Sequence, residues 1–149
     1  MKTIRGDLIS LALEGHFDVI LHGCNCFCTM GAGIAKQIKS VFKQAYKVDL
    51  ASGKNPKKLG KISVAEIEKP PLFVVNCYTQ VGFGRGSVQV DYDAVRSCMN
   101  GVKDRFAGNR IGYPKIGAGL AGGDWNLIAT IIDEVLIGED HTLVEYVPS

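Results

Sequence analysis

Short apolar runs alternate with longer amphipathic segments along most of the chain. The runs are rich in Val, Ile and Phe and are bounded by Gly, Pro or polar residues, as in "LFVVNCYT". Such runs are typical of strands that are buried on both faces of a sheet. They predict strands at TIRGDL (3–8), DVILHGCN (18–25), GKISVAEI (60–67), LFVVNCYT (72–79), RIGYPKIG (110–117) and HTLVEYV (141–147).

Three segments between these runs have apolar residues at spacings of three and four, which predicts amphipathic helices at 34–46, 92–106 and 124–137. Asp124 stands where a helix N-cap belongs. Strands that alternate with helices predict a mostly parallel sheet covered on both faces. With no linker or repeat to divide the chain, we expect one α/β domain over residues 1–149.

Glycine is the conspicuous residue, at 18 positions concentrated in 31–33, 82–86 and 117–123. Two of these clusters, "MGAG" and "GAGLAGG", follow a predicted strand and precede a predicted helix, where α/β proteins bind ligands. Glycine lets the backbone approach a ligand closely, and a helix N-terminus favours a phosphate. Taken singly, each cluster is more often an ordinary tight turn. Together they predict a diphosphate held from two sides.

Several other sites are disfavoured by spacing. The GxGxxG of 117–122 comes late and lacks an acidic residue about 20 positions further on, which argues against a Rossmann dehydrogenase. A Walker pattern is absent, which argues against an NTPase. The C-x-C-x-C spacing of Cys24, Cys26 and Cys28 differs from paired zinc ligands, so we expect no metal and no cofactor.

Composition adds few constraints. Hydrophobic residues make up 46%, charged residues 21%, and the net charge of +2 is too small to predict nucleic-acid or membrane binding. Five cysteines and an N-terminal "MKTIRGDLIS" without a long apolar core predict reduced thiols, no signal peptide and a cytoplasmic location. We expect a monomer. The lysines of 54–61 are interpreted as a solvated surface.

Three motifs in order along the chain resemble the macro domain family. They are "GDL" at 6–8, "HGCNCFCTMGAGIAKQIK" at 22–39 and "YPKIGAGLAGGDW" at 113–125. The most similar branch contains the ADP-ribose 1''-phosphate phosphatases and the terminal ADP-ribose–protein glycohydrolases. The resemblance implies a three-layer α/β/α sandwich around a mixed, mostly parallel sheet, with ADP-ribose as the ligand.

The resemblance also implies where ADP-ribose would be bound. Asp7 would accept a hydrogen bond from the adenine amino group, and the alternative is that it caps a helix or turn. Tyr146 would pack near adenine, and the alternative is an ordinary core or edge position in the last strand. The first glycine loop would wrap the distal ribose and diphosphate, and the second would close over the diphosphate. The predicted ligand-binding residues are Asp7, Leu8, Cys24, Met30, Gly31, Ala32, Gly33, Ile34, Thr79, Gln80, Ile116, Gly117, Ala118, Gly119, Leu120 and Tyr146.

His22, Asn25 and Asp124 are the predicted catalytic residues. Asn25 would hydrogen-bond ribose hydroxyls. The ordinary pKa of histidine suits proton transfer near neutrality, but a lone histidine after an apolar strand is as often structural. Asp124 would activate water or simply cap the following helix.

Two departures from the branch pattern decide the preferred chemistry. Glycohydrolases of this branch typically carry a lysine where this chain has Gln80, and some carry an aspartate where it has Ala121. A glutamine cannot form a lysine adduct, so we favour hydrolysis of ADP-ribose 1''-phosphate to ADP-ribose and phosphate. Removal of ADP-ribose from ADP-ribosylated macromolecules or from acetyl-ADP-ribose, and non-catalytic ADP-ribose binding, are kept as alternatives. Residues 81–92, including Arg85, are interpreted as a glycine-rich lid.

Overall fold

A six-stranded sheet forms the centre of the computed structural model, which describes residues 1–82, 88–119 and 121–148. The strand order is β1-β6-β5-β2-β4-β3, and every neighbouring pair is parallel except β3 and β4. The strands are β1 (Lys2–Gly6), β2 (Val19–Cys24), β3 (Ile62–Ile67), β4 (Leu72–Tyr78), β5 (Arg110–Tyr113) and β6 (Asp140–Tyr146). The prediction of a mixed, mostly parallel sheet is confirmed, and each of the six apolar runs overlaps a strand. The first run, 3–8, extends past β1 to Leu8, where a helix begins.

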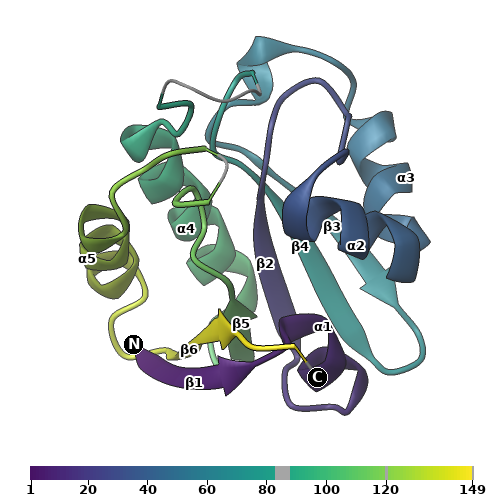
Figure 1. Cartoon of the computed structure of the whole chain (residues 1–149), viewed down its shortest axis with the longest axis vertical. Coiled ribbons are helices and arrows are strands. Elements are labelled where there is room, and N and C mark those ends of the chain that lie inside the picture. Colours follow the sequence, from purple (N-terminus) through teal and green to yellow (C-terminus); the bar gives the residue numbers. More distant parts are fainter. Residues whose placement is uncertain (83–87, 120, 149) are drawn as a thin grey trace.

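Helices cover both faces of this sheet, so the predicted three-layer architecture is also confirmed (Figure 1). α4 (Tyr92–Phe106) and α5 (Trp125–Val135) lie on one face, and α2 (Gly33–Val41) and α3 (Lys43–Ala51) lie on the other. α1 (Leu8–Leu13) packs in the same core as α2 and α3, and a short 3₁₀ turn, η1 (Pro56–Lys58), leads towards β3.

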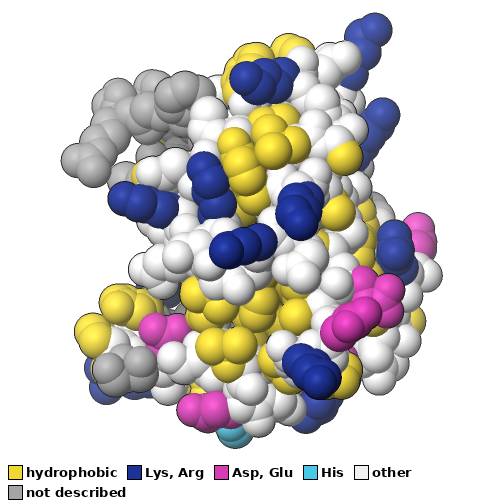
Figure 2. Space-filling view, turned by 90° about the vertical axis from the view of Figure 1, so that its right-hand side faces the viewer, with side chains coloured by type: hydrophobic (Ala, Val, Ile, Leu, Met, Phe, Trp, Pro, Cys, Tyr) yellow, Lys and Arg dark blue, Asp and Glu magenta, His cyan; other side chains and the backbone are white. Residues whose placement is uncertain are grey.

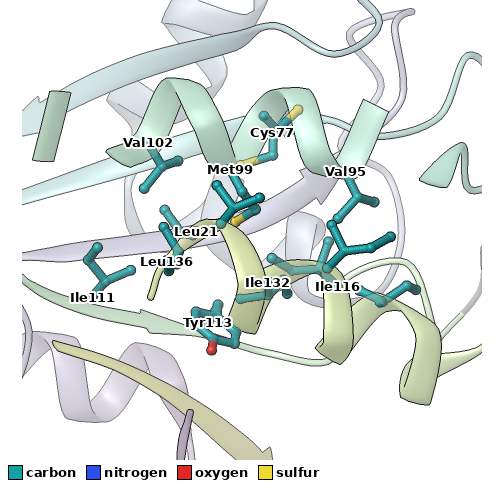
Figure 3. Packing of buried hydrophobic residues seen from close by; sticks show 14 of the residues in the cluster. Leu21, Cys77, Val95, Met99, Val102, Ile111, Tyr113, Ile116, Ile132 and Leu136 are labelled. Atoms are coloured by element: carbon teal, nitrogen blue, oxygen red, sulfur yellow. The ribbon is translucent and has the colours of Figure 1, made fainter. Parts of the chain in front are cut away.

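The larger of the two main cores lies between the sheet and the α4–α5 pair (Figure 3). α4 contributes the residues that its three–four spacing predicts, and α5 contributes a strongly apolar face. Fully buried side chains from five elements meet there: Leu21, Cys77, Ile111, Tyr113, Val95, Met99, Val102 and Ile132. This core fixes the positions of β2 and β5, whose carboxyl ends carry the two glycine loops.

β1 and β6 form one side of the sheet, although they are far apart in the sequence. Their parallel register pairs Lys2 with Thr142 and Gly6 with Tyr146, and the backbone of Val147 donates to the carbonyl of Gly6 over 2.8 Å. β1 pairs with no other strand among the described residues.

The predicted helix at 34–46 is wrong in its extent, because two helices occupy the region. α2 ends at Val41 and α3 begins at Lys43, with Phe42 between them in a non-helical conformation (φ −115°, ψ 80°). The Phe42 ring is buried among the residues that hold both helices to the sheet. The three–four spacing continues through this break, so periodicity alone does not reveal it. None of the described helices is long and apolar enough to span a membrane.

Candidate functional site

A cavity of about 700 Å³ lies where β2 and β5 end, between the loops that follow them. Residues from both predicted glycine loops line it, so Gly33 and Gly119 border one space although they are far apart in the sequence. The lining residues are Gly23, Cys24, Asn25, Thr29, Met30, Gly31, Ala32, Gly33, Ile34, Ala35, Asp49, Gln80, Pro114, Lys115, Ile116, Gly117, Ala118, Gly119 and Ala121. The cavity is within the size range of small-molecule sites.

The first loop is held by its own polar side chains. The side chain of Asn25 accepts from the backbone N–H of Phe27 over 2.8 Å and donates to Thr29 Oγ1 over 2.6 Å. Cys28 (φ 58°) and Met30 (φ 39°) are in the left-handed region that residues other than glycine seldom adopt. Such backbone conformations persist only where the surrounding structure enforces them, and they concentrate at binding sites.

The loop leads into the N-terminus of α2, which borders the cavity. Ala32 takes the N-cap position in an extended conformation, and no side chain caps the helix in the described structure. A helix start leaves backbone N–H groups without intrahelical partners, and the helix dipole adds positive potential there. The N-terminus of α2 therefore suits an anionic group of a ligand.

The second loop is compact because its glycines allow close backbone approach. Gly117 has φ 74°, and its carbonyl accepts from the N–H of Gly123 over 2.8 Å. A Cβ on Gly123 would lie 2.6 Å from that carbonyl oxygen, so a side chain would break the turn. A Cβ on Gly119, by contrast, would meet no described atom within 4 Å. Gly119 therefore presents bare backbone to the cavity.

Twelve of the predicted site residues line this cavity, and six do not. Those that line it are Cys24, Asn25, Met30, Gly31, Ala32, Gly33, Ile34, Gln80, Ile116, Gly117, Ala118 and Gly119. Those that do not are Asp7, Leu8, His22, Thr79, Asp124 and Tyr146. Leu120 and the central part of the predicted lid, 83–87 with Arg85, lie outside the described residues.

His22 is fully buried behind the cavity, and this placement argues against its predicted proton transfer. Its Nε2 lies 2.6 Å from the Oδ1 of Asn76, which accepts the hydrogen bond, and Asn76 in turn donates to the carbonyl of Ala45. Burial lowers the pKa of His22 to about 4. The ring is therefore neutral near pH 7 and links β2, β4 and α3.

This burial makes folding stability depend on pH. Between pH 6.5 and 4 the unfolded chain binds a proton on His22 that the folded protein does not, so stability falls as the pH is lowered through this range. The contribution of His22 to this slope is at most about 1.4 kcal/mol per pH unit. Urea unfolding from pH 7.5 to 4.5 should show a shallower slope for His22→Gln than for wild type. Equal slopes would contradict this assignment.

Asp124 caps α5 and is exposed outside the cavity. Its Oδ1 accepts from the backbone N–H of Asn126 over 2.9 Å, which confirms the predicted N-cap and leaves its predicted catalytic role without a supporting contact. Asp7 likewise caps α1 by accepting from the N–H groups of Ile9 and Ser10.

Three further predicted ligand-binding residues, Tyr146, Leu8 and Thr79, do not line the cavity. Tyr146 is 67% exposed and pairs with Gly6, next to Asp7, in the β1–β6 register, so Asp7 and Tyr146 lie near each other. Leu8 is part of the core formed with α2 and α3. Thr79 is fully buried, and its Oγ1 has no partner among the described residues.

The cysteines are neither cross-linked nor arranged for metal binding. All five are free and buried, and no group of His, Cys, Asp and Glu in the described parts of the chain could hold a metal ion. Cys24 is the cysteine that lines the cavity. Burial raises the pKa of the Cys24 thiol well above its ordinary value, so it is a weak candidate for a nucleophile.

Sequence reasoning missed a buried ion pair that reaches the cavity. Asp49, on α3, lines the cavity. Its Oδ1 accepts hydrogen bonds from Lys58 Nζ over 3.1 Å and from the Tyr78 hydroxyl over 2.7 Å. Lys58 is buried, so the interpretation of Lys58 as solvated is wrong, although Lys54, Lys57 and Lys61 are exposed. One signal was available, because Asp49 follows the buried Ala45 by four positions on the same helix face.

Comparison with known proteins identifies the family. The Macro domain family model matches residues 21–132. An uncharacterised 17.5 kDa protein from the tk-vs intergenic region of Enterobacteria phage T4 is 33% identical over 99% of this chain and 97% of its own length. The chain therefore belongs to the macro domain family, and the resemblance noted in its motifs is confirmed.

One more relative and one solved structure are similar to this chain. The ADP-ribose 1''-phosphate phosphatase of Candida albicans is 28% identical, with 90% of this chain and 92% of that protein covered. The structure of Thermosipho africanus DarTG in complex with ADP-ribose is similar in fold, with a TM-score of 0.76 and 17% identity over 97% of this chain and 40% of that chain.

Proposed function

We propose that this protein binds ADP-ribose in the cavity and removes the terminal phosphate of ADP-ribose 1''-phosphate, giving ADP-ribose and inorganic phosphate. The observation that carries the proposal is the convergence of two glycine loops and one helix N-terminus on a single cavity. Backbone N–H groups at such positions suit the phosphates of a nucleotide ligand. The Candida albicans phosphatase and the ADP-ribose-bound DarTG structure support the choice of ligand.

The charge distribution favours an anionic ligand as well. Residues 36–61 contain eight lysines and a single acidic residue, whereas the whole chain has a net charge of only +2. Figure 2 shows Lys and Arg side chains spread around apolar patches on the side of the molecule where α2 and α3 lie. Lys115, which lines the cavity, is exposed as well. This positive potential raises the local concentration of a nucleotide.

The identity of two residues favours phosphate release over removal of ADP-ribose from macromolecules. Gln80 lines the cavity and donates to the carbonyl of Gly82 over 2.7 Å, and it has no amine that could attack a sugar carbon. Ala121, also at the cavity, brings no carboxylate. A phosphatase needs a preorganised anion site and an oriented water, which places fewer demands on titratable side chains.

Non-catalytic ADP-ribose binding is the second candidate, because neither His22 nor Asp124 lines the cavity. The discriminating experiment incubates the wild-type protein with ADP-ribose 1''-phosphate, measures inorganic phosphate, and measures ADP-ribose binding by calorimetry. We expect phosphate release that Asp124→Asn leaves within about twofold, since asparagine is an equally good N-cap. Binding of ADP-ribose without phosphate release would establish the second candidate instead.

Asp7 allows a test of where the adenine lies. Asp7→Ala should lower the free energy of unfolding by about 1 kcal/mol through loss of the α1 cap, whereas Asp7→Asn should retain the cap. If the carboxylate also accepts a hydrogen bond from adenine, Asp7→Asn should weaken ADP-ribose binding by about tenfold at unchanged stability, because the substitution removes a hydrogen bond to a charged acceptor. Calorimetry and urea unfolding measure the two effects separately. Unchanged affinity would restrict Asp7 to its capping role.

A further inference from the structure

Asp49 is the one carboxylate residue among the described residues that line the cavity. It lies on α3, close to the loop that follows β2, and its side chain is only 1% exposed. Other carboxylates that the motifs suggested lie elsewhere, since Asp124 and Asp7 cap helices outside the cavity. Any water activated by a carboxylate in this cavity would therefore depend on Asp49.

The two oxygens of Asp49 have different surroundings. Oδ1 is bound on two sides, by the ammonium of Lys58 and the hydroxyl of Tyr78. Oδ2 is buried and has no hydrogen-bond partner among the described residues. A buried carboxylate oxygen normally has a partner, because leaving it without one costs free energy. The side chain is thus fixed through one oxygen and has its full accepting capacity left on the other.

Neighbouring groups fix the orientation of this carboxylate. Lys58 Nζ also donates to the carbonyl of Gly53 over 2.7 Å and lies 4.0 Å from the centre of the Tyr78 ring. The Tyr78 hydroxyl is further held by Ser52 and Ser63. A base of this kind needs a fixed orientation, which these contacts supply.

We propose that Asp49 Oδ2 holds and deprotonates the water that attacks the terminal phosphate, with Lys58 and Tyr78 as positioning residues. This inference rests on the proposed phosphatase function. The water oxygen bonds to phosphorus, and the bond from phosphorus to the C1'' oxygen of ADP-ribose breaks. One water proton passes to Asp49 and from there to the released oxygen, while the other remains on the phosphate, so the carboxylate is regenerated.

The test compares Asp49→Asn with Asp104→Asn, an exposed aspartate on α4 that lies outside the cavity. For Asp49→Asn we expect kcat for phosphate release to fall at least about 100-fold, the typical contribution of a general base. The Kd for ADP-ribose should stay within about threefold, because the phosphate-binding backbone is untouched. Thermal stability should fall in either case, because the variant leaves the buried Lys58 ammonium without its counter-charge. A purely structural residue would instead weaken ADP-ribose binding together with kcat. Asp104→Asn should match wild type in kcat and Kd.

The outcomes separate this inference from the function on which it rests. Phosphate release by wild type together with undiminished kcat in Asp49→Asn would overturn the role of Asp49 and leave the phosphatase proposal standing. No release by wild type, with ADP-ribose still bound, would overturn both.

A second measurement does not require the variant to fold. A high-resolution crystal structure of the wild-type protein with ADP-ribose should show an ordered water about 2.5–3.0 Å from Asp49 Oδ2, on the side of the terminal ribose. A protein group on Oδ2 in place of that water, or no water there, would overturn the proposal.

Discussion

Lys58→Met is expected to lower the free energy of unfolding by about 3–5 kcal/mol, the largest stability change that we predict for this protein. The ammonium of Lys58 and the carboxylate of Asp49 are both buried and lie 3.1 Å apart. Removing the ammonium leaves a carboxylate in the interior without its counter-charge, and that is more costly than losing an exposed ion pair. Urea unfolding monitored by circular dichroism measures the effect.

Lys57→Met provides the matched control, because Lys57 is the preceding residue of the same 3₁₀ turn and is exposed. It should change stability by less than about 0.5 kcal/mol. The double variant Lys58→Met/Asp49→Leu should recover much of the loss, since a neutral apolar pair carries no unpaired charge. If Lys58→Met proved no more damaging than Lys57→Met, the pair would be contributing little to the fold.

Gly119→Val is expected to weaken ADP-ribose binding by at least about tenfold, or 1.4 kcal/mol, with little change in stability. The added Cβ would point into space with no described atom within 4 Å, and Gly119 is not in the left-handed region, so the folded backbone tolerates a side chain. The valine side chain would occupy the space that a ligand needs in order to approach this backbone closely. Gly119→Ala should show a smaller effect in the same direction, and calorimetry measures both.

The control for these variants is Gly101→Ala, inside α4 and away from the cavity. Its Cβ would lie 3.5 Å from the Ile62 side chain, an ordinary contact, so the change should raise stability by about 0.5–1 kcal/mol through helix propensity and leave binding unchanged. Unimpaired ADP-ribose binding by Gly119→Val would place the ligand away from the second loop.

Local sequence pattern predicted the strands, α4 and α5 well. The strands are short apolar runs, and in both helices the apolar residues that face the sheet recur every three or four positions. The two glycine loops were predictable for a related reason, since parallel strands bring their carboxyl ends to the same edge. The break at Phe42 was not predictable, because it depends on how a single ring packs between two helices and the sheet rather than on periodicity.

The chemistry of the site was harder to predict than its shape. A histidine at position 22 suggested proton transfer. In the fold, however, His22 is buried and hydrogen-bonded to Asn76, which is 54 positions away in the sequence. Asp49 and Lys58 are nine positions apart, in separate elements, and nothing in their spacing indicates that they pair. Burial and long-range partners decide the role of an ionisable side chain, and both are properties of the tertiary structure.

The pairing of β1 with β6 has a consequence for the order of folding. Lys2 aligns with Thr142, so β1 has to wait for β6, which is made about 140 residues later, before it can join the sheet. Contacts of such long sequence separation carry a large loop-closure entropy and form late. During synthesis, the residues of β1 are therefore expected to remain accessible to chaperones and proteases until β6 has left the ribosome.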